Sequence, residues 1–179
     1  CVTRAPGLVL AQPNYVKKVV FPLEVLASVA VGTALFHAIT SLVILVLFEL
    51  LAFGALPLTF LWLPLVWLPV VLVCLAATWL LSALGVFLRD LGQLVGVLMS
   101  MLMFLSPIFY PISAMPPRWQ PLLLLNPLAQ AIEVTRRVTV DGVRPGMAYL
   151  LIGTALGLGV CELAFGVFSR CKRAFADVM

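Results

Sequence analysis

The chain has 179 residues, of which 64% are hydrophobic and 10% are charged, and its formal net charge is +4. Soluble domains are typically about 45–50% apolar and about 25% charged, so a chain of this size could not hide its apolar surface from water. The composition excludes an ordinary soluble protein and predicts one embedded in lipid. We assign the positive charge to membrane topology rather than to nucleic-acid binding.

Residues 1–22 combine apolar residues with prolines and two lysines. Lys17 and Lys18 are flanked by valines and a phenylalanine, which favours a short amphipathic element at the cytoplasmic membrane surface, closed by Pro22. The alternative is the tail of a preceding span followed by a loop. The chain starts at Cys1 without a cleavable signal sequence, so we expect a fragment whose start has been lost.

Long runs without a fixed charge follow, and a span needs roughly 20 apolar residues. Gly54 and Pro57 interrupt the start of the longest run, and the last run becomes long enough only if it includes Glu162. Helices satisfy every backbone polar group in lipid, and the runs do not alternate as β-strands would, so we expect an all-α membrane protein. The four predicted spans cover about residues 25–50, 61–88, 91–112 and 147–168.

The lysines and arginines predict the orientation, because cytoplasmic loops carry the larger share of them. One side would hold Arg4, Lys17, Lys18, Arg89, Arg170, Lys172 and Arg173, and the other Arg118, Arg136, Arg137 and Arg144. The first group is larger, so we expect both ends of the chain to be cytoplasmic, including the tail 169–179. The connection 113–146 would then be external.

Three places within or between the spans carry polar groups. His37 lies in the first span, where a hydrogen bond to a neighbouring helix is favoured over a proton relay. Glu162 is the lone carboxylate in a span, and it either reaches the cytoplasmic interface or is neutralised within the bundle. Arg89 and Asp90 form a tight cytoplasmic corner, which is either a solvated turn or a contact with a cytoplasmic partner.

The third predicted span starts with a stripe of small residues and ends in prolines. Gly92, Gly96 and Ser100 recur at four-residue spacing, which permits close approach of another helix. Pro107 and Pro111 each remove a helical hydrogen bond. The carbonyls so freed need partners, so this helix end should be buried in protein or line a wet cavity.

The predicted external segment 113–146 contains two pieces that are too short to span, divided by Asn126 and Pro127. Their mixture of apolar and polar residues predicts short amphipathic helices at the outer face or dipping into it. In the second piece, Glu133 stands at i, i+3 from Arg136 and at i, i+4 from Arg137, spacings that favour ion pairs.

The sequence holds no motif of a catalytic or cofactor site. It lacks the G-x-x-x-x-G-K-[ST] loop that cradles phosphates, as well as the H-E-x-x-H and G-x-S-x-G motifs. The four cysteines have no metal-ligand spacing, and no span carries the pair of carboxylates that ion-coupled carriers often use. We therefore expect no enzyme activity, cofactor or metal in this chain, and an energy source in another subunit.

Five segments together resemble the membrane permease of the ABC transporters that export polysaccharides such as O-antigen, capsule and teichoic acid. They are NYVKKVVFPLEVL (14–26), FLRDLGQL (87–94), FLSPIFYPISAMPPRW (104–119), NPLAQAIEVTRR (126–137) and FSRCKRAFADVM (168–179). They occur in the family's order and at its spacing, and they cover nearly the whole chain.

The resemblance implies a multi-pass homodimer in the bacterial cytoplasmic (inner) membrane, bound to two ATP-binding-cassette ATPase subunits that hold ATP and Mg²⁺. Residues 1–179 would be a single permease domain surrounded by membrane lipid. They would form the last four of six spans and would lack an amphipathic amino-terminal helix and two spans.

The same resemblance implies roles for individual residues. The ATPase-coupling group would consist of Lys17, Lys18, Phe21, Pro22 and Glu24, with a second contact at Arg89 and Asp90. The channel group, near the outer part of the conduit, would be Phe104, Phe109 and Tyr110. The external gate would include Trp119, Asn126, Pro127, Glu133 and Arg136. Aromatic rings stack on sugar faces through apolar C–H groups, so a polysaccharide or lipid-linked glycan could slide along them.

Three other functions compete with export of a glycan. The first is an ABC permease for a small molecule or drug, built on the same scaffold. The second is a membrane-embedded glycosyltransferase or acyltransferase that uses Glu162, His37 or Asp90, which the absence of clustered acids disfavours. The third is a purely structural assembly subunit.

Overall fold

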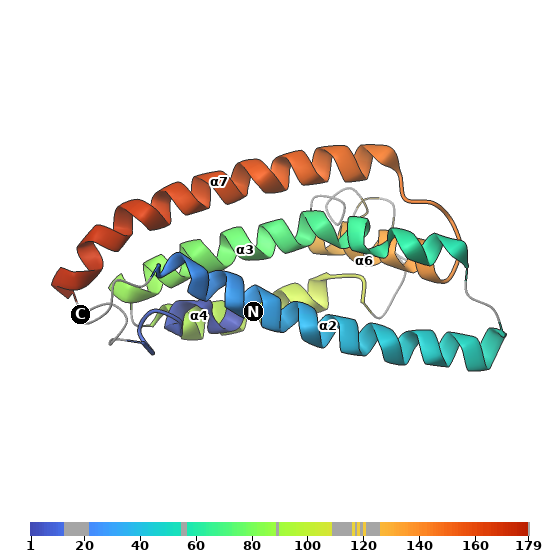
Figure 1. The fold of residues 1–179 in the computed structure, drawn as a ribbon, viewed down its shortest axis with the longest axis horizontal. Coiled ribbons are helices and arrows are strands. Elements are labelled where there is room, and N and C mark those ends of the chain that lie inside the picture. The colour runs from blue at the N-terminus through green and yellow to red at the C-terminus, as the bar shows by residue number, and fades with distance from the viewer. Residues whose placement is uncertain are drawn as a thin grey trace. The chain divides into compact units, whose positions relative to one another are not determined.

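The computed structural model describes residues 1–12, 22–54, 57–88, 90–108, 116, 118, 120 and 126–178, and every regular element in those ranges is a helix (Figure 1). In chain order the elements are η1 (Val2–Gly7), α2 (Glu24–Phe53), η2 (Leu58–Trp62), α3 (Leu63–Phe87), α4 (Leu91–Leu105), α6 (Pro127–Thr139) and α7 (Met147–Val178). The all-helical fold class is confirmed for the described ranges.

Three helical segments are long and apolar enough to cross a membrane, namely Glu24–Ala52, Leu58–Phe87 and Met147–Lys172. They correspond to the first, second and fourth predicted spans. The third predicted span, about 91–112, corresponds to α4, which has 15 residues and ends at Leu105. Its end is explained by Pro107, which cannot continue the helical ladder. A count of four spans therefore stays a prediction, and residues 109–112 lie outside the described ranges.

Helix α7 continues to Val178, well beyond the predicted end of the last span at residue 168. The charged stretch after Phe168 is therefore part of the same helix as the predicted span, and the position at which the span ends stays a prediction. Phe168 and Phe175 are seven residues apart and therefore share one helical face, and both side chains are buried. No glycine or proline interrupts this stretch, so burial of that face extends the helix.

The chain divides into two compact units, which are described separately. Unit 1 comprises Cys1–Ala38, Val71–Met99 and Gly157–Met179, and unit 2 comprises Ile39–Val70 and Ser100–Leu156. Helices α2, α3, α4 and α7 contribute residues to both units.

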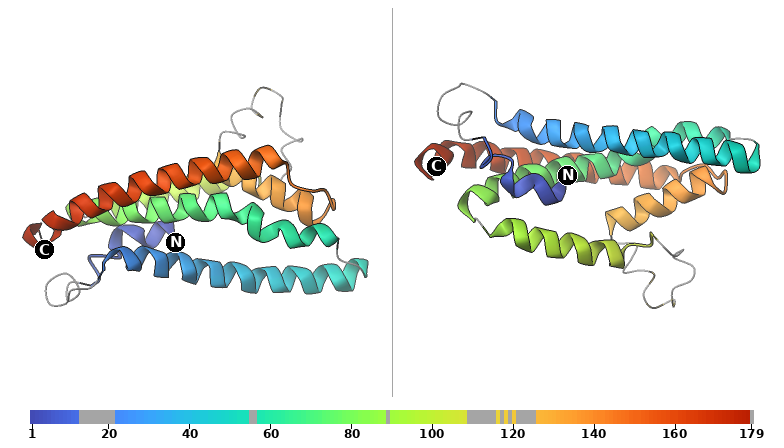
Figure 2. Two further views of the ribbon diagram at one scale, coloured as in Figure 1. Left: turned by 45° about the horizontal axis from the view of Figure 1, so that its top comes forward. Right: turned by 90° about the horizontal axis from the view of Figure 1, so that it is seen from below.

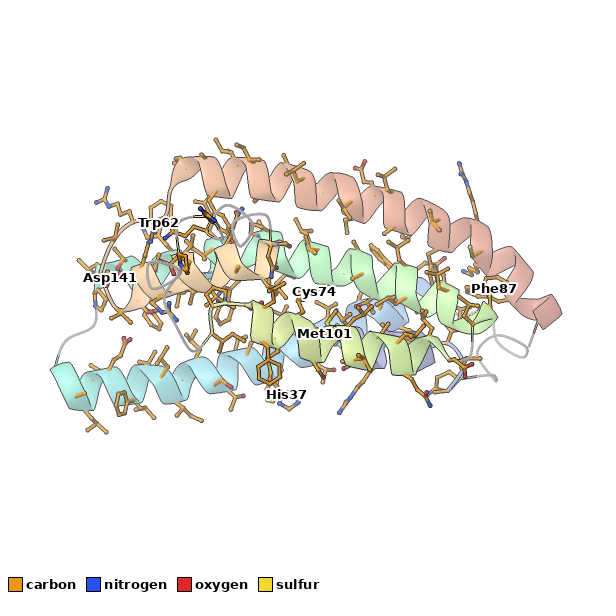
Figure 3. All side chains as sticks on the ribbon, turned by 180° about the vertical axis from the view of Figure 1, so that it is seen from behind. His37, Trp62, Cys74, Phe87, Met101 and Asp141 are labelled. Atoms are coloured by element: carbon orange, nitrogen blue, oxygen red, sulfur yellow. The ribbon has the colours of Figure 1, made fainter. Side chains whose placement is uncertain are left out.

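The core of unit 1 forms where α7 packs on α3. Its buried residues are Val9, Leu23, Ala27, Ala76, Trp79, Ala83, Val86, Cys161, Ala164, Phe168 and Phe175. The ring of Phe175 lies 5.7 Å from that of Phe168 and 6.0 Å from that of Phe87 at the end of α3, which Figure 3 labels. Small residues of α3 and α7 allow the helices to approach, and the aromatic rings fill the space near their ends.

The amino-terminal element η1 packs closely on α3. A Cβ at Gly85 would overlap the backbone carbonyl of Pro6, so only glycine permits this approach. Pro6 and Ala5 are buried as a result. The predicted amphipathic element of residues 1–22 is therefore helical at Val2–Gly7, whereas residues 13–21 lie outside the described ranges and its membrane placement stays a prediction.

Glu24 connects the first turn of α2 to two other helices of unit 1. Its carboxylate oxygens accept hydrogen bonds from Lys172 Nζ at 2.9 and 3.1 Å, and its carbonyl accepts one from Trp79 Nε1 at 3.1 Å. These contacts join α2 to α7 and to α3.

The core of unit 2 consists of Leu63, Val66, Val138 and Leu150, and α6 lies beside the first turns of α7 (Figure 2). Side-chain hydrogen bonds hold its elements together: Thr59 donates to the carbonyl of Val138 at 2.7 Å, and Tyr149 donates to that of Val66 at 3.0 Å. A Cβ at Gly153 would lie 3.2 Å from that of Pro69, so α7 and α3 approach closely at this glycine.

The small-residue stripe of α4 does not pack in the same way. Within the described ranges, a Cβ at Gly92 or Gly96 would meet no atom within 4 Å. Large apolar side chains are also exposed along the helices, for example Phe36 at 68% and Leu51 at 88% in α2. An apolar surface of this extent is expected where lipid or another subunit covers the helices.

Candidate functional site

The junction between α4 and α6 is the best-defined polar site in unit 2. Helix α4 ends at Leu105, and the next two residues, Ser106 and Pro107, are buried. The Ser106 N–H still donates to the Leu102 carbonyl at 2.9 Å, but Ile108 N–H donates back to the Ser106 carbonyl at 2.8 Å. The backbone has thus left the helical ladder, and its last carbonyls need other donors.

Asn126 starts α6 and also holds the end of α4. Its side-chain oxygen accepts from the Leu128 N–H at 3.0 Å, which is an N-cap, and Pro127 occupies the first turn, where its missing N–H costs nothing. Its Nδ2 donates to Ser106 Oγ at 3.3 Å. One amide side chain therefore begins one helix and fixes the end of another.

Arg136, almost three turns further along α6, supplies donors to the same helix end. Its Nη2 donates to the carbonyls of Pro107 at 3.2 Å and Ile108 at 3.3 Å. In a continuing helix, the Pro107 carbonyl would accept from residue 111, but Pro111 has no N–H. A guanidinium is well suited to this place, because the carboxyl end of a helix carries partial negative charge. The Pro107 carbonyl, just beyond the end of α4, therefore has a donor within the protein.

Glu133 links Arg136 to Arg137. Its Oε2 lies 3.5 Å from Arg136 Nη1, and its Oε1 lies 3.3 Å from Arg137 Nε. Both predicted ion pairs are therefore present. The carboxylate holds the Arg136 guanidinium toward α4, and the triad carries a net single positive charge.

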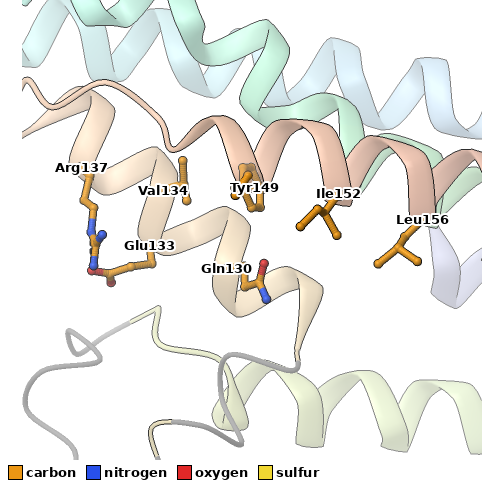
Figure 4. A pocket seen from close by; sticks show the side chains of 9 residues that line it. Gln130, Glu133, Val134, Arg137, Tyr149, Ile152 and Leu156 are labelled. Atoms are coloured by element: carbon orange, nitrogen blue, oxygen red, sulfur yellow. Dashed lines mark hydrogen bonds and ion pairs between the residues drawn. The ribbon is translucent and has the colours of Figure 1, made fainter.

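A pocket of about 440 Å³ lies between α6 and the first turns of α7 (Figure 4). Gln130, Glu133 and Arg137 of α6 supply its polar rim, whereas Tyr149, Ile152 and Leu156 belong to α7. Val134, Ala148 and Gly153 complete the lining. The polar junction at α4 and this largely apolar pocket are both lined by α6, and Glu133 belongs to both.

The predicted gate residues Asn126, Pro127, Glu133 and Arg136 thus form one connected set, but Trp119 lies outside the described ranges. Among the predicted channel residues, Phe104 is 70% exposed in α4, and Phe109 and Tyr110 are not described. Whether these residues line a conduit stays a prediction.

The predicted ATPase-coupling residues are only partly described. Lys17, Lys18, Phe21 and Arg89 lie outside the described ranges. Pro22 and Asp90 are exposed, and the Asp90 carbonyl accepts from the Gln93 N–H at 3.1 Å at the start of α4. Glu24 differs from these, because its carboxylate is paired with Lys172 within the chain.

His37 and Glu162, the polar residues predicted within the spans, are both exposed on their helices, and Figure 3 labels His37 on α2. The imidazole of His37 lies 6.1 Å from the ring of Phe36. No group of three His, Cys, Asp or Glu residues that could hold a metal occurs in the part of the chain that the structure describes.

Sequence reasoning missed two features of unit 2. Trp67 Nε1 donates to Thr135 Oγ1 at 3.2 Å, which fixes α6 against α3, and no local pattern predicts this pair. Glu49 is 7% exposed near the end of α2, and among the described residues its Oε2 has no hydrogen-bond partner. Its place as the single carboxylate between two uncharged runs is the signal that could have drawn attention to it.

Comparisons with known proteins show what the chain is similar to in sequence. The family model described as "ABC-2 type transporter" matches residues 1–139. The chain is 26% identical over 172 residues to the O-antigen export system permease protein RfbA of Klebsiella pneumoniae, covering 95% of the chain and 66% of that relative. It is 28% identical over 166 residues to the protein of the same name from Myxococcus xanthus, covering 89% of the chain and 62% of that relative. The chain thus spans somewhat less than two thirds of the length of these relatives.

Proposed function

The chain belongs to the ABC-2 type transporter family, and from this membership we propose that it is a channel-forming subunit of an ATP-driven exporter. Its substrate would be a polysaccharide or lipid-linked glycan, moved across the bacterial cytoplasmic membrane. The observation that carries this proposal is the similarity, over 95% and 89% of the chain, to two proteins named O-antigen export permeases.

The division of labour follows from the chemistry that the sequence offers. The chain has no phosphate-cradling loop, so a separate ATPase subunit would bind ATP and Mg²⁺ and supply the energy. The permease would act as a homodimer with the chain ends on the cytoplasmic side, where that ATPase is located. Its own residues would shape the conduit and transmit movement, and would not form or break bonds of the substrate.

The ATPase would contact the permease at two places. The first is the segment with Lys17, Lys18, Phe21 and Pro22, and the second is the corner formed by Arg89 and Asp90. Glu24 would fix the start of α2 next to the first contact. Its bonds to Lys172 and Trp79 support this role.

The conduit and its outer gate would involve α4 and α6. Phe104, Phe109 and Tyr110 would offer ring faces along which a glycan slides, because stacking on apolar C–H groups does not demand one pattern of hydroxyls. The gate would be the junction of Asn126, Pro127, Glu133 and Arg136, together with Trp119. The hydrogen bonds from α6 to the end of α4 support this, since movement of either helix would affect the other.

Co-purification with the cognate P-loop ATPase tests the coupling. We expect the ATPase to bind the permease and to be lost when Arg89 and Asp90 are both changed to Ala. The matched control changes Asp141 and Arg144 to Ala, an exposed pair of opposite charges in another loop. Retention of the ATPase by the first variant, or equal loss from both, would contradict the assigned contact.

Export measurements test the substrate class. Changing Phe109 and Tyr110 to Ala should lower surface glycan while the variant still assembles with its ATPase. Unchanged glycan export would contradict the role of the rings. Stimulation of the ATPase by small apolar compounds, with no effect of glycan, would favour a small-molecule or drug permease instead.

A further inference from the structure

We propose that the pocket between α6 and α7 binds one membrane phospholipid with an anionic headgroup. The phosphate would contact Arg137 of α6, and one acyl chain would lie against Ile152 and Leu156 of α7. The site shares Glu133 with the proposed gate, and the inference requires only that the chain is a membrane protein.

The apolar part of the pocket is lined by residues of α7 that follow one another along the helix. Ile152 and Leu156 are one helical turn apart, 59% and 64% exposed, in the candidate span Met147–Lys172. The lining residues of α7 run from Ala148 to Leu156, about 12 Å along the helix at 1.5 Å per residue. One leaflet holds about half of the roughly 30 Å hydrocarbon core, so part of one acyl chain would lie along this lining.

The polar rim offers a cation in a fixed position. Arg137 is 59% exposed, and among the described residues its side chain bonds only to Glu133, through Nε at 3.3 Å. Its Nη groups are therefore available to a ligand, and the ion pair restricts how the guanidinium can turn. Arginine binds phosphate through two parallel N–H···O bonds, and this geometry suits a headgroup at the mouth of the pocket.

The charge of the rim favours an anionic lipid over a zwitterionic one. Glu133 is shared by Arg136 and Arg137, so the three side chains retain one positive charge. Arg136 is also bonded to the carbonyls at the end of α4, and Arg137 is the cation among the residues that line the pocket, drawn beside Glu133 in Figure 4. An anionic headgroup carries no cation of its own, so nothing in the lipid offsets the attraction between its phosphate and Arg137.

The lining disfavours a soluble saccharide as the occupant. Most of the lining is apolar, from Val134, Ala148, Tyr149, Ile152, Gly153 and Leu156. The Tyr149 hydroxyl is already bonded to the Val66 carbonyl. A sugar would leave its hydroxyls without partners against Ile152 and Leu156, which costs free energy, whereas an acyl chain matches them.

Lipid retention by the purified permease tests the proposal. The delipidated protein in detergent is supplied with phosphatidylglycerol or phosphatidylcholine of identical acyl chains, and bound lipid per chain is measured by native mass spectrometry. We expect about one retained phosphatidylglycerol, bound more tightly than phosphatidylcholine. Arg137→Gln should weaken phosphatidylglycerol binding at least about tenfold, because a charge-assisted contact is lost. Ile152→Trp, which fills the pocket, should abolish binding of both lipids.

Two variants serve as matched controls. Leu151→Trp adds the same ring at a neighbouring position of α7 that is 69% exposed and does not line the pocket. Arg144→Gln removes an exposed arginine outside the pocket. Both should retain phosphatidylglycerol as the unchanged protein does, and all variants should elute as single species in size-exclusion chromatography.

Three results would overturn the proposal. The first is equal retention by Ile152→Trp and Leu151→Trp, and the second is no preference for phosphatidylglycerol over phosphatidylcholine. The third is complete displacement by inorganic phosphate or by a soluble oligosaccharide, which would mean that no acyl chain is held. Because no export is measured, failure of these tests leaves the proposed transport function untouched.

Discussion

The guanidinium of Arg136 lies 3.2 Å from the carbonyl oxygen of Pro107, 29 residues earlier in the chain. That carbonyl lies just beyond the end of α4 at Leu105, so it has no donor within the helix. One side chain of α6 thus supplies the hydrogen bond that the backbone of α4 cannot make for itself. In a membrane protein this matters more than in water, since lipid offers no replacement donor.

Removing this donor should destabilise the junction. Arg136→Ala leaves the Pro107 and Ile108 carbonyls without their described side-chain donor, and charge-assisted hydrogen bonds contribute about 1.5–3 kcal/mol. We expect a lower unfolding temperature in scanning fluorimetry of the purified protein. Arg144→Ala, in an exposed loop of unit 2, should unfold like the unchanged chain. An unaltered transition for Arg136→Ala would show that this bond contributes nothing.

Asn126 has two separable roles, and two substitutions distinguish them. Asn126→Ala removes both the cap of α6 and the bond to Ser106, and loss of the cap alone costs about 1 kcal/mol. Asn126→Ser keeps a capping oxygen but is too short to reach Ser106. We expect the serine variant to be intermediate in thermal stability. If the serine variant is only as stable as the alanine variant, the cap does not contribute to stability. If it is as stable as the unchanged chain, the bond to Ser106 does not contribute.

Gly85 is required by the close approach of η1. Gly85→Ala places a methyl group on the Pro6 carbonyl, and such overpacking costs about 1–3 kcal/mol. Gly92→Ala is the matched control, because its Cβ would meet no described atom within 4 Å. Gly92→Ala replaces a glycine in a helix, so it should raise the free energy of unfolding by up to about 1 kcal/mol. The two variants should therefore shift the unfolding temperature in opposite directions, and equal shifts would contradict the packing of η1 on α3.

Glu24 and Lys172 should show a measurable coupling. A double-mutant cycle with Glu24→Gln and Lys172→Met isolates their interaction, which for a partly exposed pair is about 0.2–1 kcal/mol. The coupling should weaken as salt rises, because ions screen exposed charges. Additive effects of the two changes at low salt would show that the 2.9 Å contact carries no net free energy.

Trp67 and Thr135 should behave as one unit. Trp67→Phe and Thr135→Val each remove the same 3.2 Å hydrogen bond, which contributes about 0.5–1.5 kcal/mol. The double variant should cost less than the sum of the two single changes. Full additivity would mean that the indole and the hydroxyl stabilise unit 2 independently of each other.

Some of the candidate site follows from local spacing alone. The ion pairs of Glu133 with Arg136 and Arg137 follow from the helical repeat, since residues three and four apart share a face. The end of α4 before Pro107 follows from the missing N–H of proline. The end of α7 was not predictable from charge, because the charged residues after Phe168 are carried by a helix whose other face is buried by Phe175.

The sequence by itself determined that this is a helical membrane protein, where its long apolar helices run, and that the end of α4 would need outside donors. These properties depend on composition and on neighbours within a few residues. Only the tertiary structure decided that Arg136 is that donor, that Trp67 meets Thr135, and that α6 and α7 enclose a pocket. Such contacts join residues far apart in the chain, and they depend on which helix faces pack together, which no local spacing specifies.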